Sequence, residues 1–256
     1  MLLAIDIGNT NIVLGLFSGE KLVHKFRLET IKTKSEEDYA IDMVELFLNN
    51  KVDCLKISAV AIASVVPNLT GVIEKAVKKF YSSDDALIVG KNIKLDIVID
   101  IKNKQEVGFD RLINSIAGYK KFGGNLIIID FGTATTFDVV GENGQYFGGV
   151  IAPGVNLSIK ALHDMTAQLP KIQAKPQKNV IGKSTFEAMN SGIYFGYISL
   201  VEGLIGRIKA EYKKDMKVII TGGLSPLFKG AIASDAVCPD LTLEGLKMVS
   251  NTKSYL

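Results

Sequence analysis

Apolar positions follow two periods along the chain. Short runs of consecutive or alternating apolar residues predict strands, and longer stretches with apolar residues three and four apart predict helices. In the first half, the predicted strands are 2–6, 12–17, 22–28, 57–66, 86–89 and 93–101, and the helices are 35–48, 67–80 and one that starts after Gly108. In the second half, the predicted strands are 126–130, 137–140, 146–151, 217–220 and 236–238, and the helices are 153–165, 184–213 and 243–249. Interleaved strands and helices indicate an α/β protein with mixed sheets.

One pattern occurs twice. Residues 2–11 and 126–136 both consist of an apolar strand, an Asp-x-Gly turn and small polar residues, and a second strand follows each of them. Asp6 and Asp130 are separated by about half of the 256 residues. A repeat of this length is typical of a duplicated domain. We therefore expect two domains, 1–118 and 119–256, with the two turns facing each other across a cleft.

The repeated turn carries residues suited to a polyphosphate. Gly8 allows close backbone approach to phosphate oxygens, Thr10 and the turn N–H groups can donate to them, and Asp6 can hold a hydrated Mg²⁺. Alone, the first turn is better explained as an ordinary polar hairpin, because short motifs are often fortuitous. A chance hairpin does not predict the second copy, so the repeat favours phosphate binding.

Composition limits the possible partners. A net charge of +3, without a basic stripe interleaved with aromatic residues, argues against nucleic acid. Cys54 and Cys238 lie in unrelated contexts, which indicates a reducing compartment. We see no signal peptide, and the longest apolar stretch, 192–205, is short and contains Glu202. We therefore expect a soluble cytoplasmic protein that does not enter a membrane.

Two further segments have alternative interpretations. In 108–111, Asp110 and Arg111 are either the charged first turn of a helix or a general base beside a cationic anchor. In 182–185, Ser184 caps a long helix in a capping box with Glu187, and Thr185 could also bind a substrate carboxylate at that N-terminus. The latter segment is not a P-loop, because Gln177 occupies the position of its first glycine.

The ordered set of motifs resembles the type III pantothenate kinases. The motifs are Asp-x-Gly-Asn-Thr-Asn at 6–11, Gly-x-Asp-Arg at 108–111, Asp-x-Gly-Thr-Ala at 130–134, Pro-Gly at 153–154, Thr-Ala-Gln-Leu-Pro at 166–170, the turn at 182–185 and Thr-Gly-Gly at 221–223. The resemblance extends over essentially the whole chain. The family belongs to the superfamily of acetate and sugar kinases, heat-shock ATPases and actin. The resemblance to this family implies two duplicated ribonuclease H-like domains, with mixed sheets flanked by helices.

The resemblance also implies roles for individual residues. Asp110 would be the catalytic proton acceptor, Asp130 would bind a monovalent cation, K⁺ or NH₄⁺, and Asp6 would lie near Mg²⁺, through water. The ATP-binding residues would be Asp6, Ile7, Gly8, Asn9, Thr10, Asn11, Ile12, Val13 and Thr133. The pantothenate-binding residues would be Gly108, Phe109, Asp110, Arg111 and Thr185.

The implied reaction is transfer of the ATP γ-phosphoryl group to pantothenate, which gives 4′-phosphopantothenate for coenzyme A synthesis. The resemblance implies a homodimer, with the pantothenate pocket at the subunit interface. The chain departs from the family at 101–104, where Ile-Lys-Asn-Lys replaces a Tyr-Asp-Asn-Pro segment whose tyrosine lines the pocket. Two alternatives therefore stay open: a non-catalytic nucleotide-binding regulator, and a kinase for another small hydroxy acid.

Overall fold

The computed structural model describes residues 1–81 and 86–251, which form two compact units. Unit 1 contains residues 1–96, 105–117 and 242–251, and unit 2 contains 97–104 and 118–241. The units are therefore not two contiguous stretches like the domains 1–118 and 119–256 that we expect from the sequence. Two segments cross over: residues 97–104 group with unit 2, and the last helix groups with unit 1.

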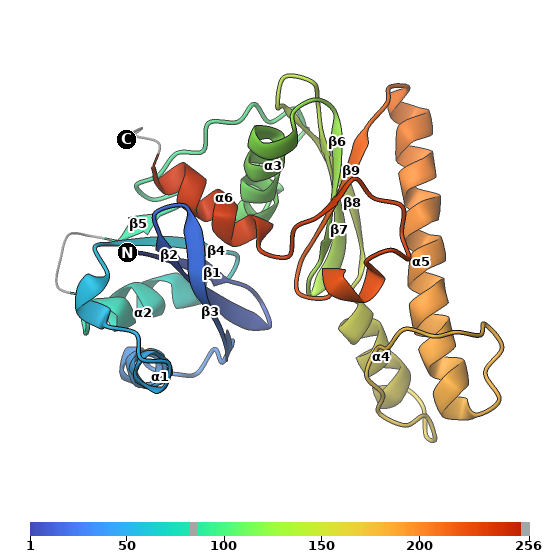
Figure 1. Cartoon of the computed structure of the whole chain (residues 1–256), viewed down its shortest axis with the longest axis horizontal. Coiled ribbons are helices and arrows are strands. Elements are labelled where there is room, and N and C mark those ends of the chain that lie inside the picture. The colour runs from blue at the N-terminus through green and yellow to red at the C-terminus, as the bar shows by residue number, and fades with distance from the viewer. Residues whose placement is uncertain (82–85, 252–256) are drawn as a thin grey trace. The chain divides into compact units, whose positions relative to one another are not determined.

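Unit 1 is built on a five-stranded mixed sheet of described residues, with the strand order β3-β2-β1-β4-β5 (Figure 1). Strands β1, β2 and β3 form an antiparallel meander, and β4 and β5 then continue the sheet parallel to β1. The strands are β1 (Leu2–Ile7), β2 (Asn11–Ser18), β3 (Lys21–Glu29), β4 (Ala59–Ser64) and β5 (Leu87–Ile88). The helices are α1 (Glu36–Asn49), α2 (Pro67–Lys78), the first part of α3 (Phe109–Phe122) and α6 (Leu241–Ser250).

The two faces of this sheet are covered by different helices. Leu3, Ile5 and Ile7 of β1 belong to the core cluster shared with α1 and α2. Because side chains alternate along a strand, Asp6 lies on the opposite face. On that face, Leu243 of α6 packs against Gly15 of β2, where an added Cβ would come within 2.9 Å of the leucine side chain.

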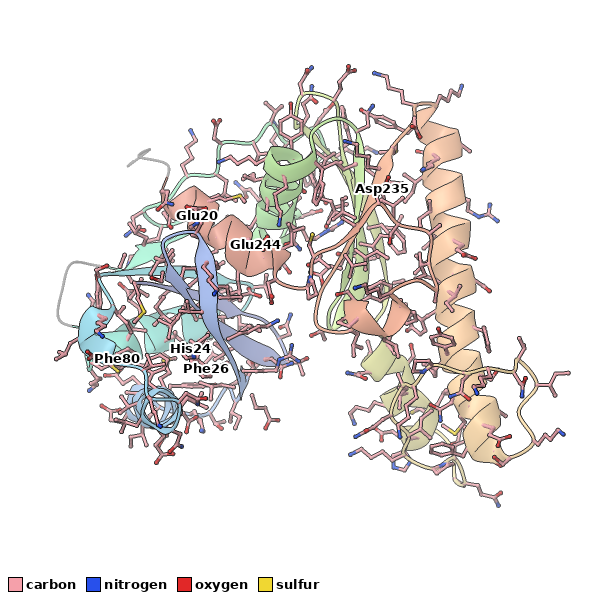
Figure 2. The ribbon with its side chains drawn as sticks, viewed as in Figure 1. Glu20, His24, Phe26, Phe80, Asp235 and Glu244 are labelled. Atoms are coloured by element: carbon pink, nitrogen blue, oxygen red, sulfur yellow. The ribbon has the colours of Figure 1, made fainter. Side chains whose placement is uncertain are left out.

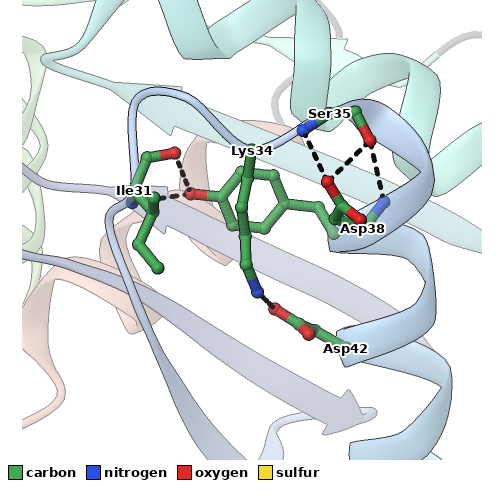
Figure 3. Close-up of polar contacts among 6 residues, drawn as sticks. Ile31, Lys34, Ser35, Asp38 and Asp42 are labelled. Atoms are coloured by element: carbon green, nitrogen blue, oxygen red, sulfur yellow. Dashed lines mark hydrogen bonds and ion pairs between the residues drawn. The ribbon is translucent and has the colours of Figure 1, made fainter.

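Local sequence sets the position of α1. Ser35 and Asp38 form a capping box, and Tyr39 both accepts a hydrogen bond from the Ile31 N–H, at 2.8 Å, and donates one to the Ile31 carbonyl, at 3.0 Å (Figure 3). The helix then packs Phe47 between Phe26 of β3 and Phe80, with ring centroids 5.8 and 5.7 Å apart. His24 stacks on Phe26 (Figure 2).

Unit 2 repeats this topology. Its described residues form a five-stranded sheet in the order β8-β7-β6-β9-β10, in which β6, β7 and β8 are the antiparallel meander and β9 and β10 are the parallel strands. The strands are β6 (Leu126–Phe131), β7 (Ala134–Val140), β8 (Tyr146–Pro153), β9 (Lys217–Thr221) and β10 (Ala236–Val237). The helices are the end of α3, α4 (Val155–Asp164) and α5 (Thr185–Tyr212). Short 3₁₀ helices cover Cys54–Lys56, Lys104–Glu106 and Ser225–Phe228.

The core of unit 2 lies between its sheet and helices α4 and α5. Ile127, Ile129 and Phe131 of β6 belong to this core. Asp130 therefore lies on the other face of β6, as Asp6 does in β1. Phe228 stacks on Phe131 with ring centroids 4.6 Å apart, and so closes the core near the end of β6.

The strand predicted at 93–101 is wrong. This segment has only isolated bridges, at Ile93 and Ile99, although its alternation suggested a strand. The Ile99 bridge joins the segment to Tyr146 at the start of β8: the Tyr146 N–H donates to Val98 and the Asp100 N–H donates to Tyr146, both at 2.9 Å. Two hydrogen bonds at a sheet edge tether the segment without forming a full strand.

None of the helices in the described residues is long and apolar enough to cross a membrane.

Candidate functional site

The turn after β1 is compact and hydrogen-bonded. The Gly8 N–H donates to the Asn11 carbonyl at 3.0 Å, and an added Cβ on Gly8 would come within 3.0 Å of the same oxygen. Thr30, which follows β3, holds the turn from outside: its hydroxyl donates to the Gly8 carbonyl at 2.7 Å and its N–H to the Thr10 carbonyl at 3.0 Å. Asn9 and Thr10 are exposed at the tip. The turn therefore presents polar groups to solvent on a fixed backbone.

The segment 108–111 lies at the same edge of the unit 1 sheet. The Val65 N–H, directly after β4, donates to the Ile7 carbonyl at 3.0 Å. A Cβ added to Gly108 would lie 3.3 Å from the Val65 side chain. On the other side, the Phe109 ring fills the space above Gly90, which follows β5. The structure thus brings Asp110 and the Asp6 turn to the carboxyl ends of β1 and β4, where ligands bind in open α/β sheets.

Asp110 is half-buried in the first turn of α3. Burial raises the pKa of this carboxyl, while the hydrogen bond from the Arg111 N–H, at 2.8 Å, and the Arg111 charge act in the opposite direction. A carboxylate with a raised pKa is a stronger proton acceptor than an exposed one. The helix-acid and general-base interpretations are both compatible with this position.

The Asp130 turn in unit 2 has a different set of neighbours. Asp130 is in register with Thr136 on β7 and Thr221 on β9, so both hydroxyl side chains share its face. Thr221 is fully buried, and its hydroxyl has no hydrogen-bond partner in the part of the chain that the structure describes. Gly222 follows with φ +89°, and a Cβ there would overlap the Asp130 carboxylate. Only glycine allows the backbone to approach that carboxylate so closely.

Thr133 lies in the exposed turn after Asp130 and is supported from below. The Gly132 N–H donates to the Ala134 carbonyl at 3.1 Å. Gly154, which caps the N-terminus of α4, packs against the backbone of Gly132 and Thr133 so closely that a Cβ would overlap the Thr133 carbonyl. The Pro153-Gly154 motif therefore lies directly against the backbone of this turn.

Thr185 lies in an open cleft of about 860 Å³ at the N-terminus of α5. The Ser184 hydroxyl accepts from the Glu187 N–H at 3.2 Å, as the predicted cap requires. The other half of the predicted capping box is wrong, because the Glu187 carboxylate accepts from the Lys183 N–H and not from Ser184. The cleft is lined by Leu162, Leu169, Gly182, Lys183, Ser184, Thr185, Ala188, Met189, Gly192 and Ile193.

The predicted residues therefore fall into three groups. The Asp6 turn and Gly108–Arg111 share one edge in unit 1. Asp130 and Thr133 share the corresponding edge in unit 2, and Thr185 lies in a cleft whose lining includes neither of them. Sequence reasoning missed Thr30, Thr136 and Thr221. Thr221 did stand in a recognised Thr-Gly-Gly motif, and the register of β9 with β6 gives its hydroxyl a place beside Asp130.

Comparisons with known proteins identify the family of the chain. The model of the family described as type III pantothenate kinase matches residues 2–207. The type III pantothenate kinase of Geobacter sulfurreducens is 44% identical over 250 residues, which are 97% of this chain and 98% of the relative. That of Paramagnetospirillum magneticum is 42% identical over 255 residues, which are 99% and 98% of the two chains.

Solved structures show the same fold at low identity. A putative Baf family transcriptional activator from Campylobacter jejuni is 20% identical with a TM-score of 0.59, covering 96% of both chains. The activator of 2-hydroxyisocaproyl-CoA dehydratase from Clostridium difficile, with bound ADPNP, is 13% identical with a TM-score of 0.52, covering 97% of this chain and 94% of that one. The predicted class of two duplicated ribonuclease H-like α/β domains with mixed sheets is confirmed. With its motifs, its length and its fold in agreement, the chain belongs to the type III pantothenate kinase family.

Proposed function

We propose that this protein transfers the γ-phosphoryl group of ATP to the primary alcohol of pantothenate, giving ADP and 4′-phosphopantothenate, the first step of coenzyme A synthesis. The observation that carries the proposal is the shared edge of unit 1. A turn suited to phosphates and a half-buried carboxyl with a raised pKa meet at the ends of the same parallel strands, in a chain of this family.

The step is an in-line displacement at phosphorus. The alcohol oxygen of pantothenate forms the new bond to the γ-phosphorus, the bond from that phosphorus to the β,γ-bridging oxygen breaks, and ADP leaves. Asp110 accepts the alcohol proton, and Arg111 helps to hold the acid substrate. Residues 6–13 and Thr133 position the ATP phosphates. Catalysis of this kind is mostly positioning and charge stabilisation.

The residues present fit the two implied cations. Asp6 and the polar tip of its turn suit a hydrated Mg²⁺, which would neutralise charge on the phosphates. Asp130, Thr136 and Thr221 offer one carboxylate and two hydroxyls on one face, a set of oxygen ligands suited to K⁺ or NH₄⁺. The partnerless buried hydroxyl of Thr221 supports a ligand at this place, because a buried polar group without a partner is costly.

The cleft at Thr185 is proposed to receive the carboxylate end of pantothenate. Its volume is in the range of small-molecule pockets, and Lys183, Ser184 and the N-terminus of a 28-residue helix favour an anion. The departure at 101–104 removes one pocket contact of the family. The residues directly before this segment, Val98 and Asp100, are anchored to β8 through Tyr146, and Ile101 packs near Gly148. We therefore expect altered affinity for pantothenate and unaltered phosphate chemistry.

A homodimer is part of this proposal, with the pantothenate pocket at the subunit interface. Leu162 of the cleft lining is an exposed apolar side chain, and so are Val180, Ile181 and Phe186, which are close in sequence to the lining residues Gly182 and Thr185. Exposed apolar patches of this kind mark interaction surfaces. The four glycines of α5 (Gly192, Gly196, Gly203 and Gly206) have open space beside them, which permits close approach of another helix. The expected cytoplasmic location stays a prediction.

One assay separates the candidates. ATP consumption is measured with pantothenate and with a panel of other small hydroxy acids, in buffers that contain K⁺, NH₄⁺ or only Na⁺. We expect turnover with pantothenate that requires K⁺ or NH₄⁺. Turnover only with another hydroxy acid would favour the kinase of altered specificity, and no turnover with any acceptor would favour the regulator. Sedimentation equilibrium tests the dimer; a monomer at micromolar concentration would contradict it.

A further inference from the structure

A chain of hydroxyl groups in unit 2 connects α5 to the end of β8. The Tyr197 hydroxyl of α5 lies 2.6 Å from the Ser158 hydroxyl of α4 and 2.9 Å from the Pro153 carbonyl oxygen. A carbonyl only accepts, and a tyrosine hydroxyl has one proton. Tyr197 therefore donates to Pro153, and Ser158 donates to Tyr197. Helices α4 and α5 lie side by side along this connection (Figure 1).

The tyrosine at the centre of this connection is buried, whereas Ser158 is half-buried and Pro153 is exposed. Tyr197 is 7% exposed, and its ring packs beside Phe228 in the core. Burial raises the pKa of Tyr197, and the Ser158 hydrogen bond opposes this, so the hydroxyl stays protonated and remains a donor at neutral pH. Hydrogen bonds in series strengthen one another, and loss of the Tyr197 hydroxyl would remove the part-buried bond to the Pro153 carbonyl.

The next link leads to the candidate phosphate turn. Pro153 is followed by Gly154, whose Cα lies against the backbone of Gly132 and Thr133. There is no room for a methyl group between them, so a shift of Pro153-Gly154 must shift the Gly132-Thr133 turn. No other side chain is needed to transmit this movement, because the contact is backbone against backbone.

We propose that Tyr197 is a positioning residue, which sets the Gly132-Thr133 turn for a nucleotide polyphosphate through Pro153 and Gly154. The inference rests on the proposed assignment of Thr133 to ATP, and it goes beyond that assignment by giving the distant α5 a role in nucleotide affinity. It predicts an effect on the nucleotide and none on the acceptor alcohol, since the Tyr197 connection ends at the turn.

The test compares Tyr197→Phe, which keeps the ring and removes the hydroxyl, with the matched control Ser158→Ala, which removes the outer hydroxyl and leaves the bond to Pro153. Calorimetric titration with the Mg²⁺ complex of β,γ-imido-ATP gives Kd. We expect Tyr197→Phe to raise Kd about three- to tenfold, the effect of one hydrogen bond, and Ser158→Ala to stay within about twofold. In turnover, the KM for ATP should rise by the same factor, with an unchanged KM for pantothenate.

Three results would overturn the inference: an unchanged Kd in Tyr197→Phe, an equal rise in both KM values, or a loss of melting temperature without a change in Kd. If Tyr197→Phe does not fold, Gly154→Ala replaces it, because its methyl group meets only the Gly132 and Thr133 backbone; an unchanged Kd would again refute the role. Absence of pantothenate turnover would overturn the proposed function only, since the calorimetric comparison does not use the acceptor.

Discussion

The two sheets have the same strand order but different chemistry at the same position. Asp6 and Asp130 occupy equivalent places, each on the central strand before its turn. Asp6 is in register with Val13 and Ala63, both apolar. Asp130 is in register with Thr136 and Thr221, both hydroxyl residues. One strand pattern thus yields a carboxylate between apolar neighbours in unit 1 and a carboxylate within a group of oxygen ligands in unit 2.

This difference suggests a division of labour. A carboxylate whose strand neighbours are apolar suits a cation that keeps its own water shell, as Mg²⁺ does. A carboxylate beside hydroxyls suits a cation that exchanges water for protein oxygens. Asp110 adds a second asymmetry, because the proposed base is anchored to unit 1 through Val65 and Phe109. Four predictions test the comparison.

The largest effect is expected at Asp110. Asp110→Asn removes the proton acceptor and keeps a group that can accept the Arg111 N–H bond. We expect kcat to fall about 10²- to 10⁴-fold, the usual contribution of a general base, with unchanged binding of β,γ-imido-ATP. Steady-state kinetics measures kcat, and calorimetry measures the Kd for β,γ-imido-ATP. Near-normal turnover would show that Asp110 is not the base.

The second prediction contrasts the two equivalent aspartates. Asp6→Asn should raise the Mg²⁺ concentration for half-maximal activity by about tenfold or more, the effect of about 1.4 kcal/mol, with an unchanged K⁺ requirement. Asp130→Asn should raise the K⁺ concentration for half-maximal activity and leave the Mg²⁺ requirement unchanged. Activity is titrated with each cation in each variant. The same cation response in both variants would refute the division of labour.

A smaller effect is expected at Thr221. Thr221→Val keeps the shape of the side chain and removes a neutral ligand, so the K⁺ concentration for half-maximal effect should rise about three- to tenfold. The stabilisation of the fold by K⁺, seen as a shift in melting temperature, should weaken in parallel. Thr242→Val, which removes a hydroxyl bonded to Asn114 in unit 1 at 2.8 Å, is the control. Equal K⁺ responses in both variants would exclude Thr221 as a ligand.

The smallest effect concerns stability and pH. Burial raises the pKa of Asp110, so between the ordinary value of about 3.9 and the folded value the native state binds more protons than the unfolded chain. The free energy of unfolding therefore falls as pH rises through this window. Asp110→Asn should be more stable than wild type at pH 7, by about 1.4 kcal/mol per unit of raised pKa. Urea unfolding from pH 4 to 8 measures the gain, and a gain that grows on acidification would contradict the burial argument.

Much of this arrangement was predictable, because its signals are local. Both Asp-x-Gly turns, the cap at Ser35 and the long helix α5 follow from residues within a few positions of one another. The supporting contacts are not local. Thr30 reaches back to Gly8, Thr221 pairs with a strand more than eighty residues earlier, and Tyr197 bonds to Pro153. A single sequence shows which residues carry hydroxyl groups, but it does not show which distant residues those groups contact.

The error at 93–101 has the same origin. The residues alternate as a strand does, yet within the described part of the chain the segment forms bridges only at Ile93, with Val89, and at Ile99, with Tyr146. Apolar periodicity shows that a segment is able to form a strand. Whether the strand forms depends on a neighbouring backbone that can supply its hydrogen bonds. The 101–104 departure directly follows the bonds to Tyr146, outside the strands, so it changes a loop and leaves the strands beside it intact.

Helix α6 has a consequence for synthesis. It follows unit 2 in the chain but packs in unit 1, where Leu243 contacts Gly15 and Lys247 pairs with Glu20 over the Phe17 ring. On the ribosome, which releases the chain from its N-terminal end, the first sheet cannot receive this helix until nearly all of the second unit has emerged. Until then, the face of the unit 1 sheet that α6 later covers stays exposed on the nascent chain. We therefore expect a chaperone to bind this face during translation.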